Sequence, residues 1–294
     1  MLRNYLVTAW RNLLRNRVYS AVNILGLALA LCCGLLVFQF VWHELNFDSF
    51  HEKGDRVHLV YQHDRRGADT PLAYHTMLSD AKREALAANY PEIIRTAKVT
   101  WIQPQVGREE RLFEQKGVAV DPSFLEMFSF SLLQGDAGAA LASPHGVVLT
   151  ERVVHQLWGD ADPMGQVVSV QVDDAPGEFT VTGVLRDVPE NSSLRFDVLL
   201  PHEGLAAAGS DVPGSFSIRS RTNCTFVELT EQATAAELEA RFPALIREDE
   251  GANVSIHLAP VEQLHFFSRR IFGAELKDRG KPAYVYTLFG IGLL

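Results

Sequence analysis

The sequence has little cysteine and no excess of basic residues. Three cysteines among 294 residues are too few for a disulfide framework. The net charge of −9 argues against a general nucleic-acid binder, which needs a basic face to displace counterions. Hydrophobic residues make up 47% of the chain, which excludes a mainly disordered protein, and Gly and Pro follow no collagen-like period.

Motifs that carry common chemistry are also missing. Gly280-Lys281 lacks the upstream Gly and the following Ser or Thr of a phosphate-binding loop, and no G-x-S-x-G elbow occurs. Neither His43-Glu44 nor His202-Glu203 is followed by the second His of a zinc-binding helix. We therefore predict no catalytic, cofactor-binding or metal-ligating residue, and we expect that the chain is not an enzyme.

Charge is distributed unevenly along the chain. Residues 1–42 contain four Arg and no acidic residue, residues 43–281 contain all 36 acidic residues, and residues 282–294 contain no charge. Between Tyr19 and Trp42 lie 24 uncharged residues, enough to cross about 30 Å of hydrocarbon as a helix. A cleaved signal peptide and a buried core helix are the weaker alternatives. The cleavage-like pattern Ala28-Leu29-Ala30 lies in the middle of the apolar run, where a signal peptide would not be cut. We place a transmembrane helix at residues 18–43.

The flanks of this helix predict its direction. The positive-inside rule places residues 1–17 in the cytoplasm and the acidic body outside, in the periplasm of the inner (cytoplasmic) membrane. Apolar residues from Leu2 to Leu14 recur at helical spacing, with Arg3, Arg11 and Arg15 on another face. This pattern predicts an amphipathic helix on membrane lipid, although an ordinary basic flank with accidental periodicity is the alternative.

The last residues are as apolar as the first helix. Residues 282–294 are uncharged and have about half the length of a membrane span. A buried terminal segment of a soluble domain would have the same composition. We interpret the segment as the start of a second transmembrane helix that is truncated at Leu294, after the basic residues Lys277, Arg279 and Lys281.

The acidic body, residues 44–281, alternates strands and helices. A strand at Val57–Tyr61, a helix from Tyr74 to Asn89 and a strand at Ile93–Trp101 form one β-α-β unit. Thr225–Leu229, a helix opened by the capping box Thr234–Glu237, and Val254–Leu258 form another. Two such units predict an α+β fold with a ferredoxin-like layer.

Residues from about 104 to 222 read as a mostly β insert between these units. We expect strands at Gly117–Asp121, Gly146–Thr150, Val167–Val172 and Phe179–Val184, with a short helix from Thr150 to Trp158. The histidines His58, His63, His257 and His265 have no ligand spacing, so hydrogen-bonded or solvated roles are favoured over a metal site. Asp173-Asp174 and Glu109-Glu110 lie in turn-like stretches, where solvated turns are favoured over a catalytic pair.

Eleven short segments, in chain order, form a recognisable series. They are Trp10–Arg17, Asn23–Leu27, Asn46–His51, Gly54–Val57, Val120–Phe128, Phe130–Asp136, Val147–Glu151, Gly159–Gly165, Phe179–Val184, Asp187–Ser192 and Arg195–Asp197. Together they resemble the MacB-like periplasmic core domain of ABC transporter permeases of the FtsX/MacB kind.

We interpret these motifs as structural. Phe47, Phe50 and Trp42 would seat the body on the membrane face. Phe124, Met127, Phe128 and Phe130 would form one apolar cluster. Asp121-Pro122 would start a helix, and Gly135, Gly159, Gly165 and Gly183 would mark turns.

The resemblance implies a permease subunit without a nucleotide site. Such a subunit works with a cytoplasmic ABC ATPase and a second permease copy. ATP binding moves the outer domains to export or release peptides, lipoproteins or drugs, with a periplasmic adaptor or the cargo as a further partner. The net charge of the chain predicts no nucleic-acid partner.

Two other function classes remain open at this stage. One is a membrane-anchored periplasmic binding, adaptor or sensory protein without transport activity. The other is an anchored hydrolase, which would need a nucleophile and a base, or a metal cluster, brought together by the fold. The sequence shows no motif for either set.

Overall fold

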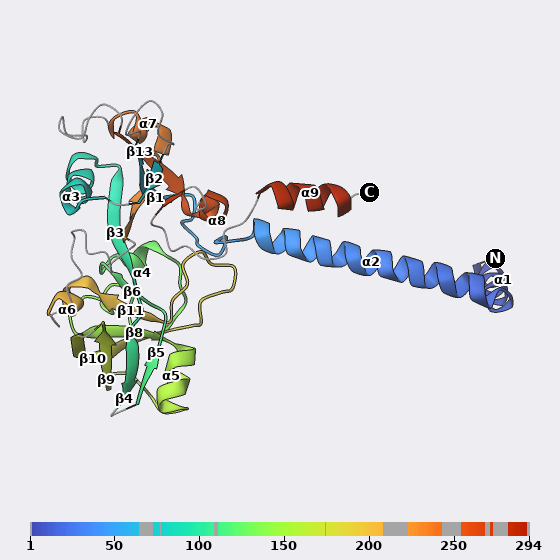
Figure 1. The fold of residues 1–294 in the computed structure, drawn as a ribbon, viewed down its shortest axis with the longest axis horizontal. Coiled ribbons are helices and arrows are strands. Elements are labelled where there is room, and N and C mark those ends of the chain that lie inside the picture. The colour runs from blue at the N-terminus through green and yellow to red at the C-terminus, as the bar shows by residue number, and fades with distance from the viewer. Residues whose placement is uncertain are drawn as a thin grey trace. The chain divides into compact units, whose positions relative to one another are not determined.

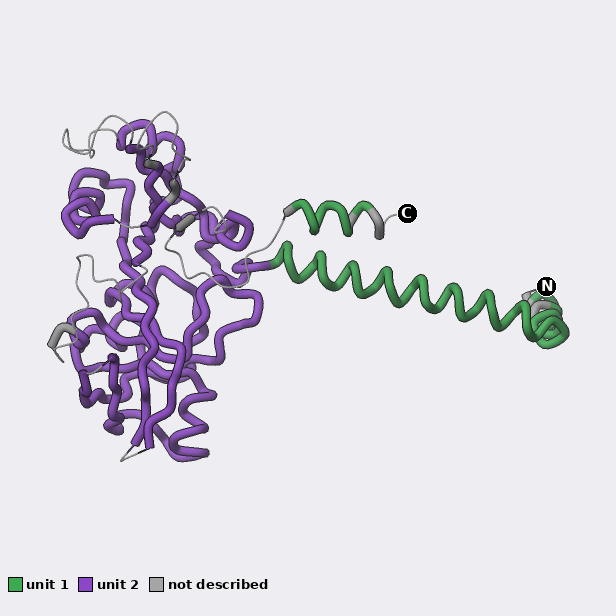
Figure 2. The backbone as a smooth tube through the Cα atoms, in the orientation of Figure 1, with its two compact units in different colours: residues 1–46, 281–294 green, residues 47–280 purple. Residues whose placement is uncertain are grey.

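The computed structural model describes residues 2–64, 73–76, 78–108, 111–173, 175–207, 223–242, 254–267, 271–272 and 282–292. The chain divides into two compact units (Figure 2). Unit 1 is Met1–Asn46 together with Lys281–Leu294, and unit 2 is Phe47–Gly280. Each unit is described by itself.

Unit 1 is helical. It contains α1 (Leu2–Arg15), α2 (Arg17–Leu45) and α9 (Pro282–Gly292). α2 has 29 residues, and its apolar part is almost entirely exposed. At 1.5 Å per residue it is about 43 Å long, which exceeds the hydrocarbon thickness of a bilayer. Within the described residues it is the one helix long and apolar enough to span a membrane.

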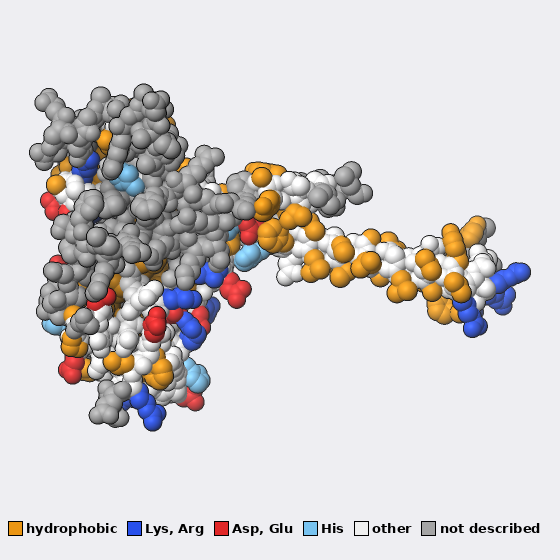
Figure 3. Space-filling view, in the orientation of Figure 1, with side chains coloured by type: hydrophobic (Ala, Val, Ile, Leu, Met, Phe, Trp, Pro, Cys, Tyr) orange, Lys and Arg blue, Asp and Glu red, His pale blue; other side chains and the backbone are white. Residues whose placement is uncertain are grey.

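The first helix separates from α2 at Asn16, whose backbone is not helical. Tyr5, Trp10 and Leu14 of α1 are exposed, and apolar side chains cover the surface of α2 while basic ones gather at α1 (Figure 3). α9 packs against α2, and its Val285 is only 2% exposed. Unit 1 therefore has the apolar surface that a lipid environment would cover.

One half of unit 2 is ferredoxin-like (Figure 1), and its two β-α-β units lie before and after the insert in the sequence. One β-α-β unit is β1 (Val57–Asp64), α3 (Asp80–Asn89) and β3 (Ile93–Ile102), and the other is β12 (Asn223–Leu229), α7 (Ala235–Glu239) and β13 (Val254–Pro260). The strands lie in the order β13-β1-β12-β3, and each neighbouring pair is antiparallel. This arrangement confirms the predicted pair of β-α-β units.

The helices of this half start at side-chain caps. The Ser79 hydroxyl accepts a hydrogen bond from the Lys82 N–H, and the Thr234 hydroxyl accepts one from the Glu237 N–H. The helix predicted from Tyr74 therefore starts six residues later, at Asp80. Instead, Ala73–His75 form β2, which pairs with β1, because an edge of β1 is available to them. Apolar side chains of α3 and α7, including Leu86 and Leu238, pack on Val60 and Val227.

The remaining strands extend the same sheet. They are β4 (Gln105–Arg108), β5 (Arg111–Glu114), β6 (Gly117–Val120), β7 (Leu132–Gln134), β8 (Gly146–Thr150), β9 (Val167–Val172), β10 (Ala175–Leu185) and β11 (Val198–Pro201). β6 pairs with β3, and the order continues β6-β11-β8-β10-β9-β4-β5. Short helices α4 (Phe124–Met127), α5 (Glu151–Trp158) and α6 (His202–Ala207) complete the predicted mostly β insert. Beyond it, β14 (Ile271–Phe272) pairs with β2.

Three of the four predicted glycine turns are present. Gly135, Gly159 and Gly165 have positive φ values of 100°, 63° and 73°. A Cβ at Gly135 would lie 2.6 Å from the Thr182 carbonyl oxygen, so this position needs glycine for space as well. Gly183 was wrongly predicted as a turn, since it lies inside β10 where the register with β8 shifts.

The predicted aromatic cluster forms the centre of the main core. Phe124 lies 4.7 Å from Phe128 and 5.8 Å from Phe130, measured between ring centroids. Phe130 also meets Phe196 edge-on at 4.9 Å. Met127 belongs to the same buried cluster, which joins the ferredoxin-like half to the insert.

Candidate functional site

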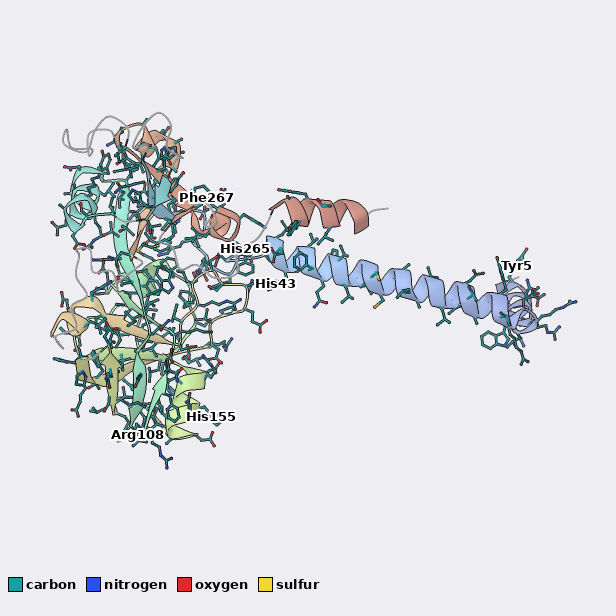
Figure 4. The ribbon with its side chains drawn as sticks, viewed as in Figure 1. Tyr5, His43, Arg108, His155, His265 and Phe267 are labelled. Atoms are coloured by element: carbon teal, nitrogen blue, oxygen red, sulfur yellow. The ribbon has the colours of Figure 1, made fainter. Side chains whose placement is uncertain are left out.

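The segment Phe47–His51 follows α2 directly in the sequence and is held in the core of unit 2. Phe47 is 3% exposed, and its ring stacks on His265 of α8 (Leu264–Phe267) at 3.6 Å (His265 is labelled in Figure 4). Phe50 packs against Phe130 at 5.8 Å. Phe47 therefore does not seat the body on the membrane face as predicted, because its ring is buried inside the domain. Phe50 is half-buried, and its role at the membrane face stays a prediction. Trp42, 61% exposed, stacks on Phe38 within α2.

Asp48 is the polar centre of this segment. Its carboxylate Oδ1 accepts a hydrogen bond of 2.7 Å from the Ser193 N–H, and its own N–H donates to the Asn191 carbonyl at 2.8 Å. The residue has a positive φ of 56°, a conformation that Asp tolerates better than most side chains. Asp48 thus fastens the chain after α2 to the loop at residues 189–194.

The environment of Asp48 changes its acidity. Burial raises the pKa of this carboxyl group from 3.8 to about 6, and hydrogen bonds from Ser193 and Ser192 offset only part of that rise. Neighbouring Ser192 and Ser193 are themselves almost fully buried. The hydrogen bonds between Asp48 and this loop are therefore shielded from water. Loss of one partner would leave the other polar group buried without its hydrogen bond.

His51 makes a second attachment. Its Nδ1 accepts a hydrogen bond of 3.2 Å from the Ser129 N–H, while the Ser129 hydroxyl accepts one from the Glu52 N–H. The ring meets Phe128 and Phe130 edge-on. Burial lowers the pKa of His51 to about 4, so the imidazole is neutral at pH 7.

A charged cluster follows immediately. Glu228 of β12 has a side chain only 2% exposed, and it pairs with Lys53 at 3.0 Å and Arg95 at 3.1 Å. Arg95 also binds Glu126 at 2.8 Å, and the Lys53 ammonium donates to the Glu126 carbonyl. The cluster therefore ties the residues after the Phe47–His51 segment to β3, β12 and α4.

A further polar network joins the two halves of the sheet at Asp121. Its Oδ2 accepts from the Lys98 N–H at 2.9 Å and pairs with Arg83 at 3.0 Å, while His202 lies 3.3 Å from Oδ1. Burial alone would raise the pKa of Asp121, but His202, the Lys98 N–H and Arg83 together lower it. Asp121-Pro122 precedes a helix as predicted, since the Phe124 N–H donates to the Asp121 carbonyl.

The histidines named from the sequence do not form a metal centre in the described part of the chain, which holds no group of three metal-type ligands. His58 contacts the Arg56 carbonyl at 3.0 Å, and His265 lies against Phe47. His63 and His257 do meet, with ring centroids 5.7 Å apart. Asp173 occupies a turn with φ of 53°. Asp174, Glu109-Glu110, Lys277, Arg279 and Lys281 lie outside the described residues.

These contacts form no chemical site, and what they can do is hold the segment mechanically. Two buried polar residues and two aromatic rings attach the Phe47–His51 segment to the loop at residues 189–194, to residues 128–130 and to α8. The charged cluster then attaches Lys53 to β12 and α4. Sequence reasoning singled out Asn46–His51 and Asp187–Ser192 as motifs but missed their pairing. The signal that was available is a lone acid inside an aromatic-rich stretch, because such an acid needs a buried partner.

The comparisons with known proteins agree with this architecture. A family model described as "MacB-like periplasmic core domain" matches residues 20–245. No curated protein sequence matches the chain.

Three solved structures are similar in fold. A domain of a Porphyromonas gingivalis protein described as a permease has a TM-score of 0.55 and 20% identity, covering 71% of this chain and 92% of that one. The periplasmic region of MacB from Actinobacillus actinomycetemcomitans has a TM-score of 0.51 and 14% identity, with 72% and 91% covered. The extracellular domain of the noncanonic ABC-type transporter YknZ from Gram-positive bacteria has a TM-score of 0.50 and 10% identity, with 69% and 99% covered.

Proposed function

Because this chain belongs to the family of the MacB-like periplasmic core domain, we propose that it acts as a permease subunit of an ABC transporter. In this proposal a separate ATPase in the cytoplasm hydrolyses ATP, and the chain transmits the resulting movement to its outer domain. Two copies of the subunit work together. The movement exports or releases peptides, lipoproteins or drugs outside the membrane.

The observation that carries the proposal is the attachment of the Phe47–His51 segment. A flexible tether after α2 would let the helix move without moving the domain. Here Asp48 is clamped to Ser193, and His51 to Ser129, within four residues of one another. A displacement of this segment therefore displaces packed core elements, since a close-packed interior transmits strain.

The proposed placement is the inner membrane, with residues 1–17 in the cytoplasm and unit 2 in the periplasm. The four Arg before the apolar part of α2 and the acidic residues after it support this direction. Exposed Trp10 and Tyr5, together with the Arg residues of α1, support contact of α1 with anionic lipid headgroups.

Purification of the tagged full chain from its own membranes, with ATP hydrolysis as the readout, tests the proposal. We expect an ABC ATPase to copurify and D48A to leave that association intact while reducing cargo-dependent stimulation of hydrolysis. The matched control is E231Q, because Glu231 is 83% exposed and pairs only loosely with Arg56. Recovery of the folded chain without any ATPase would refute the proposal and favour an anchored binding or sensory protein.

A further inference from the structure

We propose that Ser255, His257 and Glu239 form a nucleophilic site that reacts with carboxylic esters, independently of any transport role. The Ser255 hydroxyl lies 2.8 Å from His257 Nε2, and His257 Nδ1 lies 2.9 Å from Glu239 Oε2. A hydroxyl, an imidazole and a carboxylate are thus connected in the order that base-activated serine nucleophiles require.

The local fold explains why these three side chains meet. Ser255 and His257 are two residues apart on β13, so both project from the same face of the strand. Glu239 ends α7, and its other oxygen, Oε1, accepts the Leu258 N–H at 2.7 Å. Among the described strands β13 pairs only with β1, so Glu239 reaches the free edge of β13 and is fixed there by the backbone.

These contacts also determine the tautomer of His257. A carboxylate oxygen only accepts hydrogen bonds, so Nδ1 carries the proton that Glu239 binds. Nε2 is then the acceptor, and the Ser255 hydroxyl donates to it. This is the protonation state in which the imidazole can remove the hydroxyl proton.

A second hydroxyl–imidazole–carboxylate chain in the protein provides a contrast. Thr100 lies 2.9 Å from His202 Nε2, and His202 Nδ1 lies 3.3 Å from Asp121. However, Thr100 is 1% exposed, and its hydroxyl donates to Asn223 at 2.6 Å. Its proton is therefore directed away from the histidine and no substrate can reach it. Ser255 is only partly buried, and the side chains of His257 and Glu239 are 31% and 26% exposed.

The surroundings supply the other parts of an ester site. Alternation along an edge strand turns the Ile256 N–H outward, as it does the Leu258 N–H, and places it beside Ser255 as a donor for a developing oxyanion. Tyr61 stacks on His257 at 5.4 Å and contacts Phe267 at 4.9 Å (Phe267 is labelled in Figure 4). These rings provide an apolar wall for an acyl group.

The reaction balances with water as the second substrate. The Ser255 oxygen bonds to the carbonyl carbon while its proton passes to His257 Nε2. The bond between the carbonyl carbon and the alkoxy oxygen then breaks, and the alkoxy group takes that proton and leaves as the alcohol. Water next gives a proton to Nε2 and its hydroxide to the acyl carbon. The bond between the Ser255 oxygen and the acyl carbon breaks, the carboxylic acid departs, and the proton on Nε2 returns to Ser255.

Labelling with a fluorophosphonate and hydrolysis of p-nitrophenyl butyrate, both on the full chain in detergent, test the site. We expect mass spectrometry of the wild-type chain to locate the phosphonyl group on Ser255. S255A should lose labelling and hydrolysis, and H257A should reduce both by about 100-fold or more, as expected for loss of a general base. T100A is the matched control and should behave like the wild type.

The wild-type result does not depend on the folding of any variant. A wild-type chain with a folded circular dichroism spectrum but no label on Ser255 would overturn the proposal. Labelling of Ser255 without hydrolysis faster than that of S255A would overturn esters as the substrate class. Neither result bears on ATPase copurification, so this proposal and the permease function fail separately.

Discussion

Asp48 and Ser193 are joined by a hydrogen bond of 2.7 Å although 145 residues separate them in the sequence. Asp48 lies three residues after the end of α2, and Ser193 lies in a buried loop that leads into β11. The bond therefore fastens the start of unit 2 to its interior. Its strength and its pH dependence can be measured.

Replacing Asp48 should separate the effect of its charge from that of its hydrogen bond. D48N keeps an oxygen for the Ser193 N–H and removes a buried charge, so we expect it to raise the free energy of unfolding at pH 7.5 by about 1–2 kcal/mol. D48A leaves that N–H unpaired and should lower it by about 1–3 kcal/mol. Denaturant unfolding of the detergent-solubilised chain measures both changes. Equal destabilisation by the two variants would show that the charge is not costly.

Asp48 and His51 should affect stability oppositely between about pH 4 and pH 6.5. Folded Asp48 holds its proton up to about pH 6, so its contribution to stability falls as pH rises from 4 to 6. Folded His51 resists protonation down to about pH 4, so its contribution falls as pH drops from 6.5 to 4. We expect D48N to lose stability on acidification more steeply than the wild type, and H51Q less steeply. Melting temperatures across this range provide the measurement, and parallel curves for all three chains would contradict the assignment.

The free energy of unfolding should depend more on the cations of the charged cluster around Glu228 than on the cation of an ion pair at the surface. R95M removes one of two cations beside a carboxylate that is 2% exposed, so we expect a loss of about 2 kcal/mol in the free energy of unfolding. R56M breaks the Arg56–Glu231 pair, whose acid is 83% exposed, and should cost less than about 0.5 kcal/mol. Comparison of the two variants by denaturant unfolding isolates the effect of burial. A similar loss in both would mean that burial of the Glu228 carboxylate does not make its ion pair with Arg95 more important for stability.

The direction of the chain across the membrane can be tested with single cysteines. Burial raises the pKa of Cys224 to about 12, so this thiol should stay unreactive and only Cys32 and Cys33 need replacement. In a chain without Cys32 and Cys33, we expect a membrane-impermeant maleimide to label E178C in cells in which only the outer membrane has been permeabilised. N4C should react only after the inner membrane is permeabilised. The reverse pattern would contradict the proposed orientation.

Much of the fold could be predicted from local patterns in the sequence. The strands at 146–150 and 167–172 agree with the structure residue for residue, because turn residues border strongly apolar segments. The helix cap at Thr234 and the turn at Gly159, which has a positive φ, could also be predicted because each depends on neighbouring residues alone. The start of α3 was predicted wrongly, since Ala73–His75 join β1 through a pairing that no local pattern carries.

The sequence by itself determined the apolar α2, the charge asymmetry around it and the order of strands and helices, because each depends on neighbours a few residues apart. Only the tertiary structure decided that Phe47 is buried, that Asp48 binds Ser193, and that Glu239 reaches His257 and Ser255. These contacts join residues from different elements. Their energy comes from burial and from hydrogen bonds made away from water, and both exist only after the elements have packed.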